Sequence, residues 1–194
     1  MSLKPLTDFL AGLGLETLCH TDKPFFSHLL GVHRLMQEAG CDEELCRAGI
    51  FHSIYGTETT QGFKLGLGRR GDVRSLIGAR AERLAYLNCA MDRSSFDRAV
   101  QAGLEPHVIT DRLIGEEVGL SRRDLDDLCA IHLFDWLEQV PRSWRGWDYR
   151  RDAYRRMAER VGDAARAAYD KVFAREAWGL CPPSGPPSTP TPAL

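Results

Sequence analysis

Apolar residues recur at helical spacing in several segments of the chain, and glycine or proline separates these segments. Between residues 22 and 39 they fall three or four positions apart; Asp22 can cap a helix there and Pro24 suits its first turn. A second helix is expected to start near Asp42, and Gly56 is expected to stop it. The first third of the chain therefore predicts two successive helices.

The rest of the chain continues this pattern. Residues 56–71 contain five glycines and no apolar period, which indicates a loop. Residues 91–120 are the least regular, and a small β-hairpin could form around 107–115. Ser121 and Asp124 have the spacing of a capping box at the start of a helix. Helical spacing returns in three segments, which are residues 72–90, 121–139 and 148–177. We therefore predict an all-α helical bundle with one small hairpin insert.

The length of 194 residues suits one domain with a sizeable buried core, which we assign to residues 1–178. Residues 179–194 are rich in proline and small polar residues, so we predict a disordered tail. Because such a tail cannot cover a core, truncation after Leu180 should leave the melting temperature nearly unchanged.

Net charge and cysteine content limit which binding partners and which cellular compartment the sequence predicts. A formal net charge of -2 predicts no binding to nucleic acid or to an anionic membrane. The six cysteines form no C-x-x-C pair, which excludes a zinc ribbon and favours reduced, buried thiols. No signal peptide and no stretch of transmembrane length is evident. We therefore predict a cytoplasmic protein, and the sequence leaves open whether it forms a homodimer.

Three titratable residues lie in strongly apolar segments that are far apart in the sequence. Asp135 follows a run that predicts a helix buried on all sides, and His52 and His28 lie in two earlier apolar runs. Each has a plain structural explanation: Asp135 could pair with an arginine, and either imidazole could be a satisfied core residue. Burying the three separately would be costly, whereas burying them against each other or a metal ion lowers that cost. We therefore expect His28, His52 and Asp135 to converge.

This arrangement resembles the HD-domain superfamily, whose members carry a histidine, then a His-Asp pair, then an aspartate on successive helices of a bundle. Residues 20–139 are most similar to the hydrolase domain of the bifunctional guanosine-tetraphosphate synthetase/hydrolases. The segment from His52 to Thr57 also resembles the His-Ser-Ile-Tyr-Gly-Thr signature of uncharacterised HD-like proteins. The segments that resemble the hydrolase domain are Lys23 to Val32, Ala48 to Ser53 and Ala130 to Trp136. The resemblance implies that His28, His52 and Asp135 hold one or two divalent metal ions.

The sequence departs from the family at the dyad. Ser53 stands where the family has the metal-binding aspartate, and Gly56 and Thr57 replace a following glutamate-aspartate pair, so that the nearest acid is Glu58. Two histidines and one carboxylate remain, which could still hold manganese, iron or zinc with open coordination positions. By the resemblance, the catalytic set is His52, Ser53 and Asp135. Further candidate ligands are His20, His33, His107, His132 and Glu58.

A substrate site is expected beside the dyad. Arg69, Arg70 and Arg74 follow the glycine-rich loop and could clamp a phosphate or carboxylate, although they could equally form a solvated basic face. Tyr55 and Glu58 lie just past the dyad and could line the pocket, and ordinary packing is the alternative for Tyr55.

Four interpretations are compatible with these residues. The resemblance favours a metal-dependent enzyme that acts on a small anionic molecule, phosphorylated or nucleotide-like, as a phosphohydrolase. An iron-dependent HD-type oxygenase would use additional histidines. The alternatives are a degenerate, non-catalytic HD-like binding module and a helical protein whose polar residues only satisfy one another. Metal content separates the enzymes from the other two.

Overall fold

The computed structural model describes residues 2–15, 19–20, 23–103 and 105–178 of the chain. It confirms the mostly helical fold with a small hairpin. The predicted cap Asp22 and the predicted disordered tail, residues 179–194, lie outside the described residues. In the part of the chain that the structure describes, no helix is both long and apolar enough to cross a membrane.

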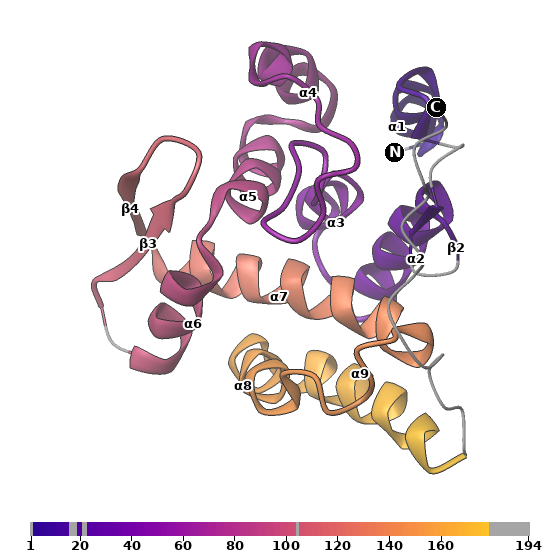
Figure 1. Ribbon diagram of the computed structural model, residues 1–194, viewed down its shortest axis with the longest axis vertical. Coiled ribbons are helices and arrows are strands. Elements are labelled where there is room, and N and C mark those ends of the chain that lie inside the picture. The colour runs from indigo at the N-terminus through magenta and orange to yellow at the C-terminus, as the bar shows by residue number, and fades with distance from the viewer. Residues whose placement is uncertain (1, 16–18, 21–22, 104, 179–194) are drawn as a thin grey trace, which may run out of the picture.

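Helix α7 (Arg122–Gln139) lies at the centre of the molecule, with helices packed on both sides (Figure 1). The predicted capping box is present, because Ser121 accepts from the Asp124 amide and Asp124 accepts from the Ser121 amide. Nearly every position from Leu125 to Glu138 is buried, which agrees with the prediction of a helix that is apolar on most sides. This helix places Asp135, which is partly exposed, at the wall of an interior pocket.

Helices α2 (Phe25–Glu38) and α3 (Glu43–Ile50) pack against each other and against α7. Asp42 caps α3 through its contact with the Leu45 amide. Pro24 lies just before α2, in β2 (Lys23–Pro24), which pairs with β1 (Cys19–His20) in a two-residue antiparallel ladder.

The second predicted helix ends earlier than expected. His52 lies in a series of turns after α3, whereas the pattern placed it inside a helix that reached Gly56. The His52 carbonyl accepts from Asn88 Nδ2 at 2.8 Å and from Cys89 Sγ at 3.1 Å. Because helix α5 (Ala79–Ala90) supplies these donors, the chain can leave α3 without an unsatisfied buried carbonyl at His52.

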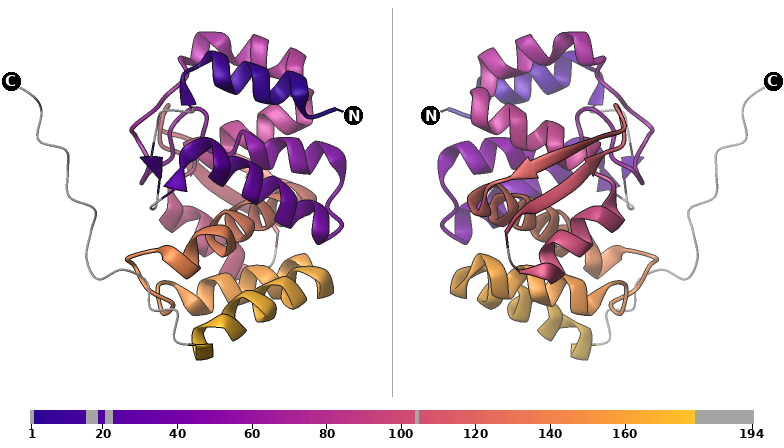
Figure 2. Two further views of the ribbon diagram at one scale, coloured as in Figure 1. Left: turned by 90° about the vertical axis from the view of Figure 1, so that its right-hand side faces the viewer. Right: turned by 90° about the vertical axis from the view of Figure 1, so that its left-hand side faces the viewer.

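Helix α1 (Lys4–Gly12) contacts α4 (Arg70–Ile77). These two helices lie at the end of the molecule opposite to α8 (Arg151–Val161) and α9 (Asp163–Phe173) (Figure 2). The predicted single helix over 72–90 is wrong. Gly78, with a φ of 95° and a ψ of 159°, separates α4 from α5 (Ala79–Ala90). A side chain disfavours that backbone conformation, and glycine permits it. The short helix η2 (Leu67–Arg69) precedes α4 within the predicted loop.

The irregular region contains a helix that the pattern did not reveal. Helix α6 (Arg93–Ala102) precedes the hairpin of β3 (His107–Asp111) and β4 (Glu116–Leu120), whose register pairs His107 with Leu120. The hairpin is confirmed, but its second strand begins at Glu116, just after the end of the predicted region 107–115. β3 packs on α6, and the Thr110 amide donates to Ser95 Oγ at 2.9 Å.

The C-terminal layer consists of α8 (Arg151–Val161) and α9 (Asp163–Phe173), followed by η4 (Ala174–Trp178). The predicted continuous helix over 148–177 is therefore also wrong. Gly162 breaks the helix with a φ of 122°, a backbone conformation that other residues rarely adopt. α8 packs on α7 and closes the face opposite to α2 and α3, while the short helix η3 (Val140–Arg142) follows α7 directly.

Candidate functional site

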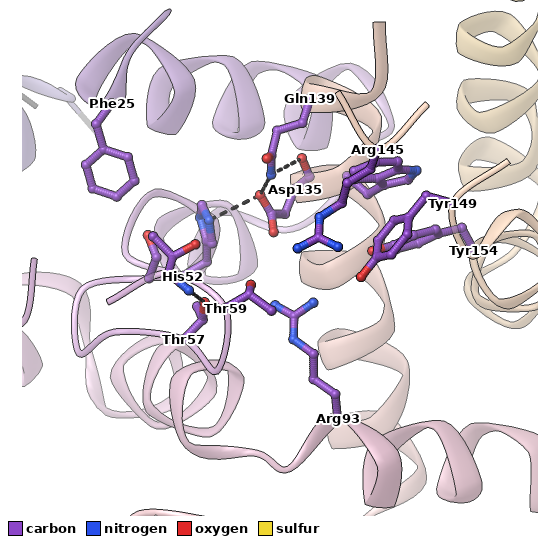
Figure 3. A pocket seen from close by; sticks show the side chains of 13 residues that line it. Phe25, His52, Thr57, Thr59, Arg93, Asp135, Gln139, Arg145, Tyr149 and Tyr154 are labelled. Atoms are coloured by element: carbon purple, nitrogen blue, oxygen red, sulfur yellow. Dashed lines mark hydrogen bonds and ion pairs between the residues drawn. The ribbon is translucent and has the colours of Figure 1, made fainter. Parts of the chain in front are cut away.

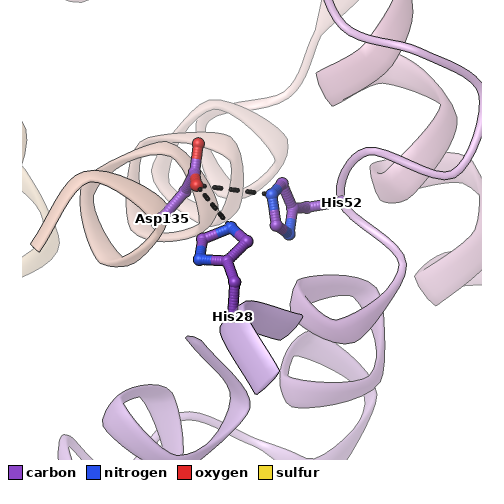
Figure 4. A group of neighbouring side chains, drawn as sticks. All are labelled: His28, His52 and Asp135. Carbon is purple, nitrogen blue, oxygen red and sulfur yellow. Dashed lines mark ion pairs between the residues drawn. The ribbon is translucent and has the colours of Figure 1, made fainter. Parts of the chain in front are cut away.

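His28, His52 and Asp135 converge in the interior, as predicted (Figure 4). Asp135 Oδ1 lies 3.1 Å from His28 Nε2 and 3.3 Å from His52 Nε2. One donor atom from each residue can be chosen so that all three lie within 4.8 Å of one another. The imidazole rings meet nearly edge to face, at an interplanar angle of 86°. The three residues come from α2, the turn after α3, and α7, in the order in which the chain presents them.

Each imidazole is held through its other nitrogen. His28 Nδ1 lies 2.5 Å from Glu138 Oε2, and His52 Nδ1 lies 2.8 Å from the Gly49 carbonyl oxygen. Both partners are acceptors, so each Nδ1 carries the hydrogen. Both Nε2 atoms then face the Asp135 carboxylate, and each needs a proton or a shared metal ion between itself and the oxygen. Metal-binding histidines typically show this arrangement, with a carboxylate or carbonyl behind the ring.

The electrostatics of the three residues are strongly coupled. Burial disfavours the charged form of Asp135, but its interactions with His52 and His28 outweigh burial and hold the carboxyl pKa well below its usual range. Burial lowers the pKa of His28, yet hydrogen bonds to Asp135 and Glu138 raise it overall. The site therefore favours an ionised carboxylate and concentrated positive charge, which a divalent cation could supply in place of protons.

The donor set fits a divalent metal ion. Bonds of about 2.0–2.2 Å to one ion place neighbouring donor atoms about 2.8–3.6 Å apart in octahedral or tetrahedral geometry. The two separations between nitrogen and oxygen, 3.1 and 3.3 Å, fall in this range. Two imidazoles and one carboxylate suit zinc, iron or manganese and leave coordination positions open.

Two glycines lie against the groups that hold the imidazoles. A Cβ built on Gly31 would come within 2.8 Å of Glu138 Cγ and Oε1. A Cβ on Gly49 would collide with the sulfur of Met36, which is fully buried. Gly31 therefore leaves room for the carboxylate behind His28, and Gly49 allows α3 to approach α2 closely while its carbonyl orients His52.

Ser53 lies beside the three residues and lines the adjoining pocket. It is 4% exposed, and its buried hydroxyl has no hydrogen-bond partner among the described residues. A buried hydroxyl without a partner costs about 1–3 kcal/mol. Its position next to the candidate metal ligands agrees with the prediction from the dyad, and a bound water or ligand could satisfy it.

The pocket opens from Asp135, and the space between its walls is about 470 Å³ when the open solvent at its mouth is included (Figure 3). Arg93 and Arg145 line it, and their guanidinium groups point toward each other and toward Asp135. Gln139 contributes an amide whose Nε2 donates to Asp135 Oδ1. Its remaining lining residues are aromatic or hydroxyl-bearing: Phe25, Trp136, Tyr149, Tyr154, Thr57, Thr59 and Thr60.

The predicted substrate-binding arginines lie elsewhere. Arg70 Nε donates to Glu82 Oε1 at 2.6 Å, and Arg74 lies 3.6 Å from the same carboxylate. Arg69 pairs with Asp72 at 2.7 Å. Glu82 is fully buried and needs this positive charge, which explains the basic cluster without a substrate. The prediction that these arginines line the pocket is therefore corrected.

The two other predicted contact residues also have partners. The Tyr55 hydroxyl is buried and donates to Glu82 Oε1 at 3.1 Å, so Tyr55 belongs to the same network and does not line the pocket. Glu58 is exposed and accepts from the Arg93 backbone amide at 2.9 Å. Glu58 thus fixes the start of α6, and it is not among the clustered candidate ligands.

The additional histidines do not join the cluster in the described part of the chain. His132 packs between Phe96 and Tyr154, and neither of its nitrogens has a hydrogen-bond partner there. Burial holds its pKa well below the usual value. His33 and His107 are buried outside the group, and for His20 only the backbone is described. The prediction of further histidine ligands is therefore not met.

Sequence reasoning missed Glu138, Arg93 and Arg145. Glu138 had a usable signal, because it follows Asp135 by three positions in a helix predicted to be buried, and a second buried acid needs a partner. Arg93 and Arg145 lie in polar segments that resemble any solvated surface, so no periodicity distinguishes them.

Comparison with known proteins gives one match, to a family model described as "Domain of unknown function (DUF6817)", over residues 9–93. The matched segment contains His28, His52 and Ser53, whereas Asp135 and Arg145 lie beyond it. No curated protein and no solved structure matches the chain. The match names no activity, so any functional assignment depends on the geometry of the site.

Proposed function

We propose that this protein is an HD-like, metal-dependent phosphohydrolase that acts on a small anionic molecule. The observation that carries the proposal is the convergence of His28, His52 and Asp135, whose two nitrogen–oxygen separations are those that a single divalent ion requires. The partners behind both rings support it, because a core histidine needs no such matched orientation.

The order of the elements supports the HD-like assignment. A histidine on α2, a second histidine just after α3 and an aspartate on α7 follow the arrangement that the resemblance predicts. All three elements pack against one another, as a shared site requires.

The residues of the chain have distinct roles in this proposal. His28, His52 and Asp135 would hold the ion, which when bound would lower the pKa of a coordinated water and polarise a phosphoryl oxygen. Gln139 holds the Asp135 carboxylate through its amide. The Ser53 hydroxyl faces the pocket without a partner in the described part of the chain, and it can donate to a water or a substrate oxygen.

Two alternatives are less well supported. An oxygenase of this class would use more histidines, and within the described residues only two gather with a carboxylate. A degenerate binding module is compatible with serine at the dyad, but a module without metal would leave two imidazole nitrogens directed at one carboxylate oxygen.

Metal content provides the first test. Protein purified without a histidine tag should bind about one Mn²⁺, Fe²⁺ or Zn²⁺ per chain, and Asp135→Asn should abolish binding without unfolding the protein. Metal-loaded protein should hydrolyse simple phosphate monoesters, and the variant should not. If the wild-type protein binds none of these three metal ions, the proposal is overturned.

A further inference from the structure

Two arginines face each other across the pocket beside the candidate metal site. Arg93 is the first residue of α6, and Arg145 lies in the segment between η3 and α8. Their guanidinium groups point into the same space, next to Asp135 (Figure 3). Two like charges brought together in a partly enclosed pocket repel each other unless an anion lies between them.

Neither guanidinium forms a hydrogen bond or an ion pair with a carboxylate among the residues that the structure describes. Arg93 interacts electrostatically with Asp97, but that carboxylate is paired with Arg150. Arg145 lies over the rings of Trp144 and Tyr149, with its central carbon 4.9 and 4.6 Å from their centroids. The contact between Arg93 and Glu58 involves only the backbone amide. The pattern differs from that of Arg70, whose side chain is bound to a buried acid.

The only carboxylate among the described residues that line the pocket is Asp135, and it is already engaged. Its Oδ1 faces both imidazoles and accepts from Gln139. Within the described residues, two arginines without a hydrogen-bonded carboxylate therefore line the pocket, and a bound divalent ion would add to their positive charge. This surplus favours a dianion over a monoanion.

Two buried polar groups in the wall point to the same kind of ligand. Ser53 Oγ and Trp136 Nε1 line the pocket and have no hydrogen-bond partner in the described part of the chain. Both residues are 4% exposed. An indole N–H only donates and a hydroxyl can donate, so an oxygen-rich ligand satisfies both.

We propose that Arg93 and Arg145 form a subsite for the dianionic phosphate of a small phosphate monoester; as a substrate site, this rests on the proposed phosphohydrolase function. Each planar guanidinium can donate two parallel hydrogen bonds to a phosphate, and the two approach it from different elements. The monoester is favoured over a diester for two reasons. A diester carries only one negative charge, and its second organic substituent would need space between the two arginines.

Calorimetric titration tests the subsite with three probes at constant ionic strength: inorganic phosphate, methyl phosphate and dimethyl phosphate. Each is titrated into the full chain, with and without Mn²⁺. Wild-type protein should bind the first two at least about tenfold more tightly than the diester. Equal affinity for all three probes, or no binding of phosphate, would overturn the proposal. This test uses the wild-type protein alone.

The variants Arg93→Gln and Arg145→Gln should each weaken phosphate binding about tenfold or more. Arg69→Gln is the matched control, because Arg69 is an exposed arginine paired with Asp72 away from the pocket, and it should change nothing. If both pocket variants bind phosphate as the wild type does, the arginines do not form the subsite. Thermal melts establish that each variant is folded.

Metal titration in the same proteins separates the two proposals. Both pocket variants should bind Mn²⁺ like the wild type, because neither arginine is a ligand. If phosphate binding depends on the arginines but no metal binds, the proposed hydrolase function is refuted and the proposed phosphate subsite is retained. Metal binding without phosphate binding would refute the subsite and leave the metal centre.

Discussion

Glu138 is expected to control metal affinity although it is not itself a candidate ligand. Its carboxylate lies 2.5 Å from His28 Nδ1, is 7% exposed, and also pairs with Arg142. Glu138→Ala removes the group that orients the ring and makes Nε2 more basic. The loss of such a partner typically costs about 10–100-fold in metal affinity, or about 1.4–2.7 kcal/mol. Because His28 is fully buried and its Nδ1 faces this carboxylate, we expect the alanine variant near the upper value.

Glu138→Gln separates geometry from charge. The glutamine oxygen can still accept from Nδ1, but it carries no charge, so we expect a loss of about tenfold, near the lower value. Competition with a chromophoric chelator would give the affinity for Zn²⁺ or Mn²⁺, and melts without metal would report folding. Glu38→Gln is the control, because Glu38 is exposed and pairs with Arg34 on the surface. Metal affinities within twofold of the wild type for both Glu138 variants would refute the reasoning.

Three further predictions concern Ser53, His132 and Gly78. Ser53→Asp adds a hard anionic oxygen beside Asp135 and should tighten Mn²⁺ or Fe²⁺ binding in titrations; unchanged metal binding with lower stability at neutral pH would instead indicate a pocket built for use without metal. His132→Phe removes two buried nitrogens that have no hydrogen-bond partner within the described residues, and it should raise the melting temperature. The pKa of His132 is lowered in the folded state, so the unfolded chain takes up the proton first and wild-type stability falls as pH drops below about 6.5; this dependence should be weaker in the variant, and an unchanged pH profile would contradict the assignment. Gly78→Ala should cost about 1–3 kcal/mol in urea unfolding, since the φ of 95° strains any side chain, and a neutral effect would count against that account.

The candidate metal ligands could be predicted because burial of titratable groups leaves a strong local signal. His28 and Asp135 stand out as polar residues in apolar runs, and the capping box at Ser121 fixed the start of α7. His52 was identified by the same signal, although it lies in a turn. Its carbonyl is satisfied by Asn88 and Cys89, a tertiary contact that no local pattern contains.

The breaks within helices and the polar side of the pocket could not be predicted in this way. Apolar spacing continues across Gly78 and Gly162, so the pattern predicted unbroken helices, and only the backbone conformation reveals the breaks. Helix α6 buries only Ser95, Phe96 and Ala99, too few residues for a clear period. Arg93 and Arg145 face one pocket because α6 and the segment before α8 lie close together, and the sequence does not encode that arrangement locally.

The close packing at Gly31 and Gly49 also constrains how this chain can drift during evolution. At position 31, even a methyl group would displace the Glu138 carboxylate, so a relative with alanine there should carry a shorter residue at position 138 and a differently anchored first histidine. At position 49, a methyl group has to be matched by a smaller residue in place of Met36. Positions 31 and 138, and positions 49 and 36, should therefore covary among relatives that retain both imidazoles, and relatives that have lost the imidazoles should show no such coupling.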